Sequence, residues 1–417
     1  MKIAIVTINF AGSSSSLAEA HLMNGNEVDF YHVMFSSQHN LEVESFTLPT
    51  ISSRIGIKRV ENLSTDGLRR FKTFSNKFHF YNVVCFGMPR EEGLMNDIKR
   101  GLSLLVMRKV FKNLRDYHYD LINVIGQNHF SISLSSLLHS WNLPVVHSFH
   151  EVLERHLESS SLYPGIDKLI NKGIRINVFS EKSAKDLKKV IDISTYQLSV
   201  IPFGLFSGYR EYGDVEIPEL NGKENYILFY GYIEKYKGLD ILYEAINQIG
   251  CLPVKVVVAG KGNQTVLERI KNDERFILIN RWLGNAELAT LIRHSKCVVC
   301  PYLSASQSGI PQTVFNFDRP IIATDIESFE AVIQNELNGI IVRRNNVKEF
   351  ADAIKRILND DELYHQMVSN IKKYRECESI MEWKAFANRY LKKLKLLFVV
   401  IYIINRYQGF SNARFRY

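Results

Sequence analysis

The chain has 417 residues, which is enough for two ordinary domains, each with its own hydrophobic core. A hydrophobic share of 46% and a charged share of 23% exclude a largely disordered protein, and five scattered cysteines argue against a disulfide framework. The net charge of +8 favours anionic partners such as phosphates, and a mildly basic chain without a specific partner is an equally good interpretation.

The chain opens with a β-α-β pattern. The continuous apolar run KIAIVTI at 2–8 is typical of a strand that is buried on both faces. A small-residue loop, FAGSSSS, follows, then a helix from about Ser16 that stops at Gly25, and a second strand at 27–33. Strand and helix patterns keep alternating as far as LSVIPFG, which predicts a doubly wound α/β domain over residues 1–205.

The second half repeats this alternation. Residues 206–224 carry glycine, proline and charge without a period, and we expect them to connect two domains. Strand and helix patterns from YILFYGYI onward predict a second doubly wound domain over 225–385, with a ligand-binding cleft between the domains. Residues 386–417 are predicted to form a final helix that crosses back to the first domain, and dipping of its apolar part into a membrane interface is the alternative.

The sequence also bears on location. It lacks a signal-peptide pattern and has no run of the roughly 18 to 20 apolar residues that span a bilayer, so we expect a cytoplasmic protein. The stretches 52–81 and 98–117 mix lysine and arginine with apolar residues. On amphipathic helices this mixture suits peripheral contact with an anionic membrane at the inner face of the plasma membrane, and a solvated face is the alternative. No recognisable nucleic-acid module is present, so no nucleic-acid partner is expected.

One lysine is placed unusually. Lys237 lies in a short turn between a strand that ends at Gly231 and a helix pattern that begins near Gly238. The start of a helix favours negative charge, so a lysine there indicates either a bound anion beside it or an ordinary solvated loop.

Several motifs of the second half occur in a familiar order, namely GYIEKYKGLDILYEAI, VVVAGKGN, LGNAELATLIRHSKCVVCPYLSASQSG, RPIIATDIESFEAVIQNELNGIIV and EFADAIKRIL. Together they resemble the C-terminal domain of family 4 glycosyltransferases of the GT-B fold. The first half is similar to the acceptor domain of that family in NLPVVHSFHEV, VFSEKSAKDL and LSVIPFG. The resemblance implies two Rossmann-like domains facing across a cleft. It also implies transfer of a sugar from a nucleotide-sugar donor, with retention of anomeric configuration, to a bacterial surface polysaccharide or a lipid-linked oligosaccharide.

The resemblance assigns roles around the departing diphosphate. Lys237 would be a catalytic residue that stabilises this group, while Tyr232 stands where the family usually has an arginine. Two family glutamates are also replaced, by Ala305 and Thr313. Between them, a segment resembling a known subgroup leads into a short helix whose backbone N–H groups suit phosphate or sugar oxygens, and an ordinary capped helix is the alternative. Its residues are Ser306, Gln307, Ser308 and Gly309.

The resemblance also places His150, as a second catalytic residue, beside the transferred sugar; a structural histidine is the alternative. Gly12 and Ser13 would bring backbone N–H groups near the donor diphosphate or the acceptor. The remaining residues expected at the donor are Gly231, Tyr232, Lys261, Arg281, Trp282 and Thr313. For Lys261 a plain turn is an equal interpretation, and Trp282 is equally typical of a core residue.

No metal-binding pattern is found in the sequence, and no metal or other cofactor is expected. Two other functions stay open. A GT-B-like sugar-nucleotide epimerase would turn over without an acceptor, and a non-catalytic homologue that only binds or scaffolds is consistent with Tyr232, Ala305 and Thr313.

Overall fold

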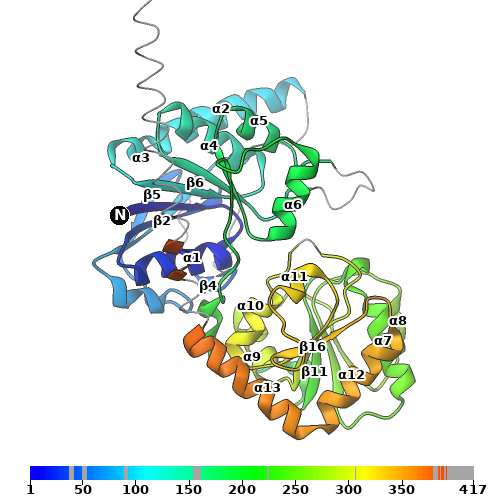
Figure 1. Cartoon of the computed structure of the whole chain (residues 1–417). Coiled ribbons are helices and arrows are strands. Elements are labelled where there is room, and N and C mark those ends of the chain that lie inside the picture. The colour runs from blue at the N-terminus through cyan, green and yellow to red at the C-terminus, as the bar shows by residue number, and fades with distance from the viewer. Residues whose placement is uncertain are drawn as a thin grey trace, which may run out of the picture.

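The chain folds into two α/β domains (Figure 1). The prediction of two doubly wound Rossmann-like domains is confirmed. The computed structural model describes residues 1–36, 42–48, 54–88, 93–153, 161–222, 225–305, 307–378, 384–385, 387–388 and 391.

The first domain is built on an eight-stranded sheet in the order β10-β9-β8-β7-β1-β2-β6-β5, parallel except for the edge strand β5. Its strands are β1 Lys2–Thr7, β2 Glu27–Phe35, β5 Gly56–Val60, β6 Phe78–Cys85, β7 Leu121–Ile125, β8 Val145–Phe149, β9 Arg175–Val178 and β10 Leu198–Val200. A separate two-stranded hairpin consists of β3 Glu42–Val43 and β4 Phe46–Thr47. The helices are α1 Ala11–Met23, η1 Arg69–Phe74, α2 Leu94–Val110, α3 Lys112–Asp116, α4 His129–Ser140, α5 Ile166–Asn171 and α6 Glu181–Val190.

The second domain has a six-stranded parallel sheet in the order β13-β12-β11-β14-β15-β16. Its strands are β11 Tyr226–Tyr230, β12 Lys255–Ala259, β13 Phe276–Ile279, β14 Cys297–Cys300, β15 Ile321–Thr324 and β16 Gly339–Val342. Its helices are η4 Lys235–Lys237, α7 Leu239–Ile249, α8 Val266–Lys271, α9 Asn285–His294, α10 Ile310–Val314, η5 Phe315–Phe317, α11 Glu327–Glu330, α12 Val347–Asn359, α13 Asp361–Lys373 and η6 Tyr374–Glu378.

Both sheets are covered on two faces, which explains the continuous apolar runs in their strands. Ile3 and Ile5 of β1 pack into one core of the first domain, whereas Ala4 and Val6 pack into the other. The second domain likewise has a core on each face of its sheet. Because all strands except β5 run parallel within their sheet, their carboxyl ends form one edge per domain, and the following loops meet there.

The domains are joined by a chain segment that contains η2 Ser207–Glu211 and η3 Pro218–Leu220, and by contacts between distant segments. Asn285 at the start of α9 donates its side-chain amide to the carbonyl of Val43 at 2.6 Å. On the opposite side of the cleft, Lys185 of α6 forms an ion pair with Glu327 of α11 at 3.0 Å. These contacts hold the two carboxyl edges toward each other.

Near its end the chain turns from the second domain back toward the first (Figure 1). The side chain of Asn24 donates to the carbonyl of Lys384 at 3.0 Å, and Leu391 packs into a core of the first domain. The other residues of the stretch predicted as a final helix, 386–417, lie outside the described residues except 387–388. In the part of the chain that is described, no helix combines the length and apolarity that a bilayer crossing requires.

The first turn of the chain differs from the prediction. FAGSSSS was expected to be a loop with a helix from about Ser16, but α1 begins at Ala11. The serines can continue the helix because their hydroxyls bond to carbonyls one turn back. Ser15 and Ser16 donate to the carbonyl of Gly12 at 3.0 and 3.1 Å. Gly12 and Ser13 therefore lie in the first helical turn and not in a loop.

Three buried histidines in the first domain should make stability fall at acid pH. Burial lowers the pKa values of His21, His32 and His147 from 6.5 to about 4. A histidine that is neutral when folded, but takes up a proton when unfolded, favours unfolding between these two values. We expect full stability above pH 6.5 and, for each histidine, a loss approaching about 1.4 kcal/mol per pH unit between there and about pH 4.

His147 provides the test. Its Nε2 lies 2.9 Å from the carbonyl of Gly126, which can only accept, so Nε2 carries the proton and Nδ1 accepts from the Ser135 hydroxyl at 2.7 Å. Denaturant unfolding at pH values from about 7.5 to about 5 should give a shallower pH dependence for His147→Gln than for the wild type, by about one proton. Equal slopes would show that His147 is not held neutral.

Candidate active site

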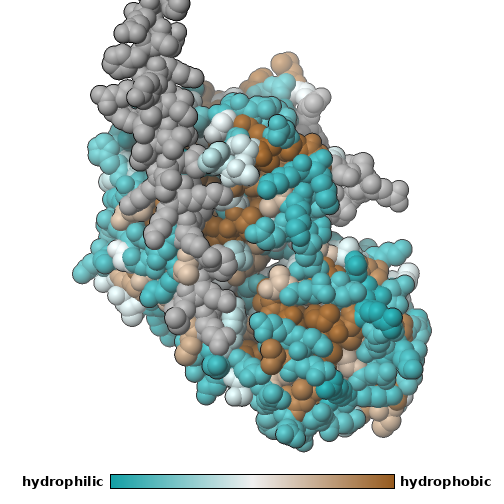
Figure 2. Space-filling model, viewed as in Figure 1, coloured by the Kyte–Doolittle hydropathy of each residue, from teal (hydrophilic) through white to brown (hydrophobic). Residues whose placement is uncertain are grey.

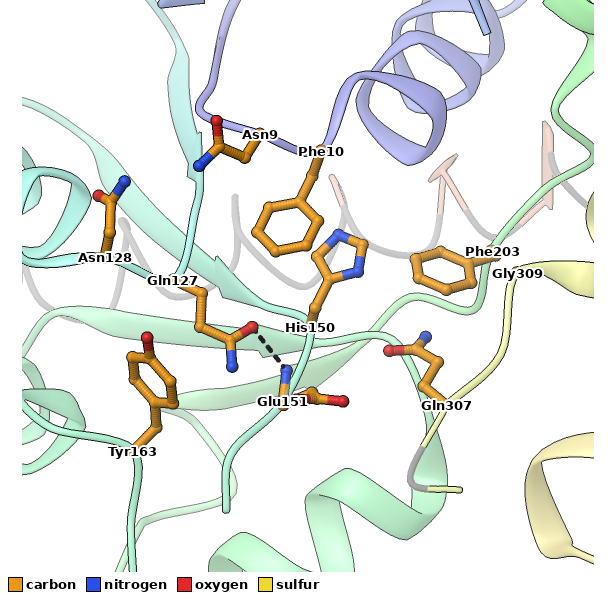
Figure 3. A pocket seen from close by; sticks show the side chains of 10 residues that line it. All are labelled: Asn9, Phe10, Gln127, Asn128, His150, Glu151, Tyr163, Phe203, Gln307 and Gly309. Carbon is orange, nitrogen blue, oxygen red and sulfur yellow. Dashed lines mark hydrogen bonds between the residues drawn. The ribbon is translucent and has the colours of Figure 1, made fainter. Parts of the chain in front are cut away.

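A cavity of about 480 Å³ lies at the carboxyl edge of the eight-stranded sheet. Loops after β1, β7 and β8 form much of its wall, and Gln307 and Gly309 reach it from the second domain (Figure 3). A group bound by one domain would therefore meet a group bound by the other in this cavity. Its lining residues are Asn9, Phe10, Gln127, Asn128, His150, Glu151, Tyr163, Phe203, Gln307 and Gly309.

His150 is the first residue after β8, and its ring is fixed from several sides. It stacks on Phe10 with 3.7 Å between the ring centroids and 13° between the planes. Phe179 and Phe203 lie 4.7 and 5.1 Å away, centroid to centroid. The Ser13 hydroxyl is 3.0 Å from Nε2. The imidazole is thus held by aromatic packing and by the contact with Ser13, and it lies at the cavity wall (Figure 3).

Gly12 has a protein partner that the sequence did not reveal. Its backbone N–H donates to Oε2 of Glu44, at 3.0 Å, from the turn between β3 and β4. A Cβ on Gly12 would lie 2.8 Å from Cδ of Glu44, so a side chain at this position would displace the carboxylate. A ligand phosphate that used the N–H of Gly12 would have to compete with Glu44 for it.

Lys237 lies at the carboxyl edge of the second sheet. It ends the one-turn helix η4, and Gly238 continues the chain with φ of 68°, a conformation that suits glycine. Only 8% of Lys237 is exposed, and its Nζ lies 5.6 Å from the ring centroid of Tyr302. A Cβ built on Gly231 would lie 2.7 Å from this Nζ, so the ammonium is close to the backbone that follows β11. The positive charge is therefore held where the strands end and not in a solvated loop.

The backbone beside Lys237 leaves no space for side chains. Gly231 and Gly260 end β11 and β12 with φ values of 103° and 142°. A Cβ on Gly260 would lie 2.1 Å from the carbonyl oxygen of Gly231. The close approach of these two loops fixes the turn from which Lys237 extends.

We expect Gly260→Ala to destabilise the second domain by about 2–3 kcal/mol, because the added methyl group meets backbone and the positive φ is strained. Gly173→Ala is the matched control, since Gly173 also has a positive φ, of 74°, in a helix C-cap, but nothing lies within 4 Å of its added Cβ. That variant should lose only about 1 kcal/mol. Thermal melting of both proteins checks the difference, and equal melting temperatures would show that the loops are not closely packed.

Tyr232 and Trp282 form an exposed aromatic pair beside these loops. Their rings stack at 5.9 Å between centroids, and they are 47% and 69% exposed, so Trp282 is not a core residue. Lys261 contacts the same segment through its backbone, because its carbonyl accepts the N–H of Ile233 at 2.9 Å. A flat aromatic surface thus stands where the family resemblance led us to expect an arginine.

The side chain of Arg281 is bound to two carboxylates of the protein. Its Nε donates to Glu219 of η3 at 2.9 Å, and an Nη lies 2.7 Å from Glu287 of α9. These carboxylates raise the pKa of Arg281, and the guanidinium in turn lowers that of Glu219. The side chain therefore ties the interdomain connection to the second domain, which leaves the backbone of Arg281 as its means of contacting a donor.

The segment before α10 approaches the first cavity. Oε1 of Gln307 is buried and has no hydrogen-bond partner among the described residues, and the side chain lines the cavity (Figure 3). Ser308 accepts the first N–H of α10 at 3.3 Å. Thr313 is 5% exposed and donates to the carbonyl of Gly309 at 3.0 Å, so its hydroxyl serves the helix. Ser306 lies outside the described residues.

A second cavity, of about 740 Å³, lies between α6 and the second domain. Ala305 lines this cavity. The position at which the family commonly has its first glutamate therefore faces the cavity but carries no carboxylate. The wall carries both signs of charge, including Lys182 and Asp186 from α6 and Lys235, Glu327 and Arg344 from the second domain. Its size is that of a small-molecule site, and its charged side chains offer hydrogen bonds to a saccharide.

Sequence reasoning missed much of the first cavity wall. Asn9 and Phe10 follow β1, and Gln127 and Asn128 follow β7. The ends of the apolar runs would have pointed to these four residues, since loops after neighbouring parallel strands meet. Phe203 also lines the cavity, but it follows β10 at the edge of the sheet. No pattern in the sequence indicated that the chain returns from this edge strand to the cavity.

The described residues contain one group with the spacing of a metal site. Ligand atoms of Glu27, Asp29 and His79 lie within 4.8 Å of one another. Lys2 already contacts both carboxylates, with Nζ 3.1 Å from Glu27 and 3.7 Å from Asp29. The group is at the amino end of the sheet, away from both cavities, and it forms an ion-pair network.

Comparisons with known proteins agree with this architecture. Residues 214–374 match the family model of glycosyl transferases group 1. The O-antigen chain mannosyltransferase C of Escherichia coli is 25% identical over 279 residues, covering 64% of this chain and 72% of the relative. A phosphatidyl-myo-inositol mannosyltransferase from Mycolicibacterium smegmatis is 24% identical over 276 residues, covering 61% of this chain and 66% of that one.

Solved structures share the fold over nearly the whole chain. Sucrose-phosphate synthase from Thermosynechococcus elongatus superposes with a TM-score of 0.61 at 16% identity, covering 96% of this chain and all of that one. HepE from Anabaena, solved with UDP-glucose, gives a TM-score of 0.61 at 12% identity, covering 94% and 99%. Taken with the family match, these findings identify the chain as a glycosyltransferase enzyme of GT-B fold.

Proposed function

We propose that this enzyme moves a hexose from a nucleotide-sugar to a growing bacterial surface polysaccharide or lipid-linked oligosaccharide, with retention of anomeric configuration, as in family 4. Two relatives that are named mannosyltransferases support a hexose donor, and the O-antigen relative supports a saccharide acceptor. Solved neighbours that hold UDP or UDP-glucose support a nucleotide-sugar donor.

The observation that carries the proposal is the position of Lys237. Its ammonium is nearly buried at the carboxyl edge of the second sheet, beside Gly231. Transfer breaks the bond between the anomeric carbon and the diphosphate oxygen, and the electron pair leaves with the diphosphate. A preorganised positive charge of low exposure stabilises that developing charge much more than a solvated one would. In this proposal Lys237 supplies it, and no metal ion or other cofactor takes part.

The first cavity would hold the reacting sugar. His150 would lie against the sugar from the first domain, while Gln307 would reach it from the second domain and accept a sugar hydroxyl with its side-chain oxygen, which has no partner in the described part of the chain. The acceptor hydroxyl would enter from the first domain, attack the anomeric carbon on the face from which the diphosphate leaves, and pass its proton to the departing diphosphate oxygen. Closure of the two domains would exclude water, which otherwise competes as an acceptor.

The donor would continue from Lys237 along the carboxyl edge of the second sheet. The exposed pair of Tyr232 and Trp282 gives a nucleobase an aromatic surface there. Lys261 and the backbone at Arg281 follow the neighbouring strands of that edge, β12 and β13. We place the enzyme in the cytoplasm, at the inner face of the plasma membrane, where a lipid-linked acceptor is presented.

A binding protein without catalysis is the second candidate, favoured by Ala305 and Thr313, which replace the family glutamates. Calorimetry with UDP-sugars, GDP-sugars and other nucleotide-sugars distinguishes the functions. Binding of one donor, with slow hydrolysis that an acceptor accelerates, supports the transferase. Binding without any turnover, or no binding at all, would contradict it, and conversion of the sugar without an acceptor would indicate an epimerase.

A further inference from the structure

Helix α2 of the first domain exposes a row of large apolar side chains. Leu94 is 78% exposed, Met95 66% and Leu105 62%. Ile98 is 50% exposed and Leu102 is 54% exposed. A solvated helix would normally carry polar residues at such positions. This face, comprising Leu94, Met95, Ile98, Leu102 and Leu105, is named the α2 face here.

The α2 face is opposite the side by which the helix packs on the protein. Ser103, Met107 and Val110 are the buried residues of α2. With about 100° per residue, Leu94, Ile98 and Leu105 project within about 40° of one another, whereas Ser103 projects on the far side. The helix therefore packs into the core through Met107 and Val110 and is also apolar on its outer side, which lies outside the core. Figure 2 shows hydrophobic surface at the top of the first domain, over α2.

Basic residues surround the α2 face. Lys99, Arg108 and Lys109 are exposed on the same helix, and Lys112 follows on α3. The acidic residue of α2, Asp97, is already paired with Arg100 at 3.1 Å. The surface thus combines an apolar stripe with an excess of positive charge. Long basic side chains at such places can lie along apolar groups while their charges reach phosphate.

The α2 face is also well placed for the proposed reaction. In Figure 1, α2 lies on the side of the first domain that is remote from the second domain. It begins at Leu94 after the loop that leaves the carboxyl end of β6, and the strands β6 and β8 end at the same edge of the sheet. His150 follows β8 at this edge. The first turn of α2, with Leu94 and Met95, therefore follows from the sheet edge that carries His150, whereas the helix lies away from the second domain.

We propose that the α2 face docks on an anionic lipid bilayer, with its apolar residues inserted into the interface and its basic residues against lipid phosphates. An amphipathic helix with apolar and basic residues in this arrangement binds through both contributions. The charge favours lipid over a second copy of this chain, because a symmetric dimer through α2 would set the same basic residues against each other. The proposal gives the peripheral membrane contact a specific surface.

The test measures binding of the full chain to vesicles of phosphatidylcholine alone and of phosphatidylcholine with phosphatidylglycerol. We expect at least tenfold tighter binding to the anionic vesicles, and weakening by added salt. I98Q/L102Q/L105Q should bind these vesicles at least tenfold more weakly, because glutamine keeps helix propensity but removes apolar area. R108E/K109E should also bind the anionic vesicles at least tenfold more weakly.

Matched controls lie away from α2. V190Q/Y196Q/L337Q removes three other exposed apolar residues, and K348E/K355E reverses two lysines of α12; both should bind within twofold of the wild type. Wild-type binding by I98Q/L102Q/L105Q would overturn the proposal. The proposal would also be overturned if the wild type sedimented as a dimer and the triple variant as a monomer, since the α2 face would then bind a second copy of the chain. Vesicle binding needs neither donor nor acceptor. Its failure would therefore not contradict the proposed transferase reaction, and a failure of the transferase proposal would not contradict vesicle binding.

Discussion

Lys237→Met should lower kcat by roughly 30- to 1,000-fold, which corresponds to about 2–4 kcal/mol of transition-state stabilisation for one preorganised charge. Methionine keeps the unbranched stem that packs beside Tyr302 but has no charge, so the fold should be preserved. Donor affinity should fall less than kcat, because negative charge on the diphosphate grows as its bond to the sugar breaks. Initial rates at saturating donor measure the loss.

Lys271→Met is the matched control for this variant. Lys271 is an exposed lysine at the end of α8 in the same domain, and the structure gives it no place in either cavity. Its rate should stay within about twofold of the wild type, as expected for a surface substitution. If Lys237→Met retained full kcat with an unchanged melting temperature, the ammonium would have no part in catalysis.

His150→Phe should lower kcat/KM by roughly 10- to 100-fold, which corresponds to about 1.5–3 kcal/mol for the loss of polar contacts in a closed site. Phenylalanine can keep the stacking on Phe10 and the packing against Phe179 and Phe203, while both ring nitrogens are lost. The variant therefore separates the polar role of the imidazole from its structural one.

Ser13→Ala separates contact with the sugar from positioning. The Ser13 hydroxyl lies 3.0 Å from Nε2 of His150 and would orient the ring without touching the substrate. We expect a smaller loss for Ser13→Ala, below about tenfold, and little further loss when it is added to His150→Phe. Additive losses would mean that the two side chains act independently. An unchanged kcat/KM in His150→Phe would leave the histidine with a packing role alone.

Much of the fold was predictable because it rests on short-range patterns. Apolar runs marked most strands of both sheets, and the turn around Gly231 and Gly238 placed Lys237 correctly at the carboxyl edge of the second sheet. His150 could be located for the same reason, as the residue directly after an apolar strand. These predictions depend on residues close together in the sequence, whose geometry a strand or a turn determines.

The remaining features depend on partners far away in the sequence. The bond between Gly12 and Glu44 joins segments 32 residues apart, and that between Arg281 and Glu219 spans 62 residues. No local pattern indicates that a predicted donor contact already has such a partner. The start of α1 was missed for a different reason, because serines favour turns unless their hydroxyls can bond within the helix, as Ser15 and Ser16 do.

A crystal structure with bound nucleoside diphosphate, from soaks with UDP and with GDP, tests the central claim most directly. We predict phosphate oxygens within hydrogen-bond distance of Lys237 Nζ, with the base toward Tyr232 and Trp282. A nucleotide bound elsewhere, or a phosphate group remote from Lys237 with that side chain unchanged, would contradict the account.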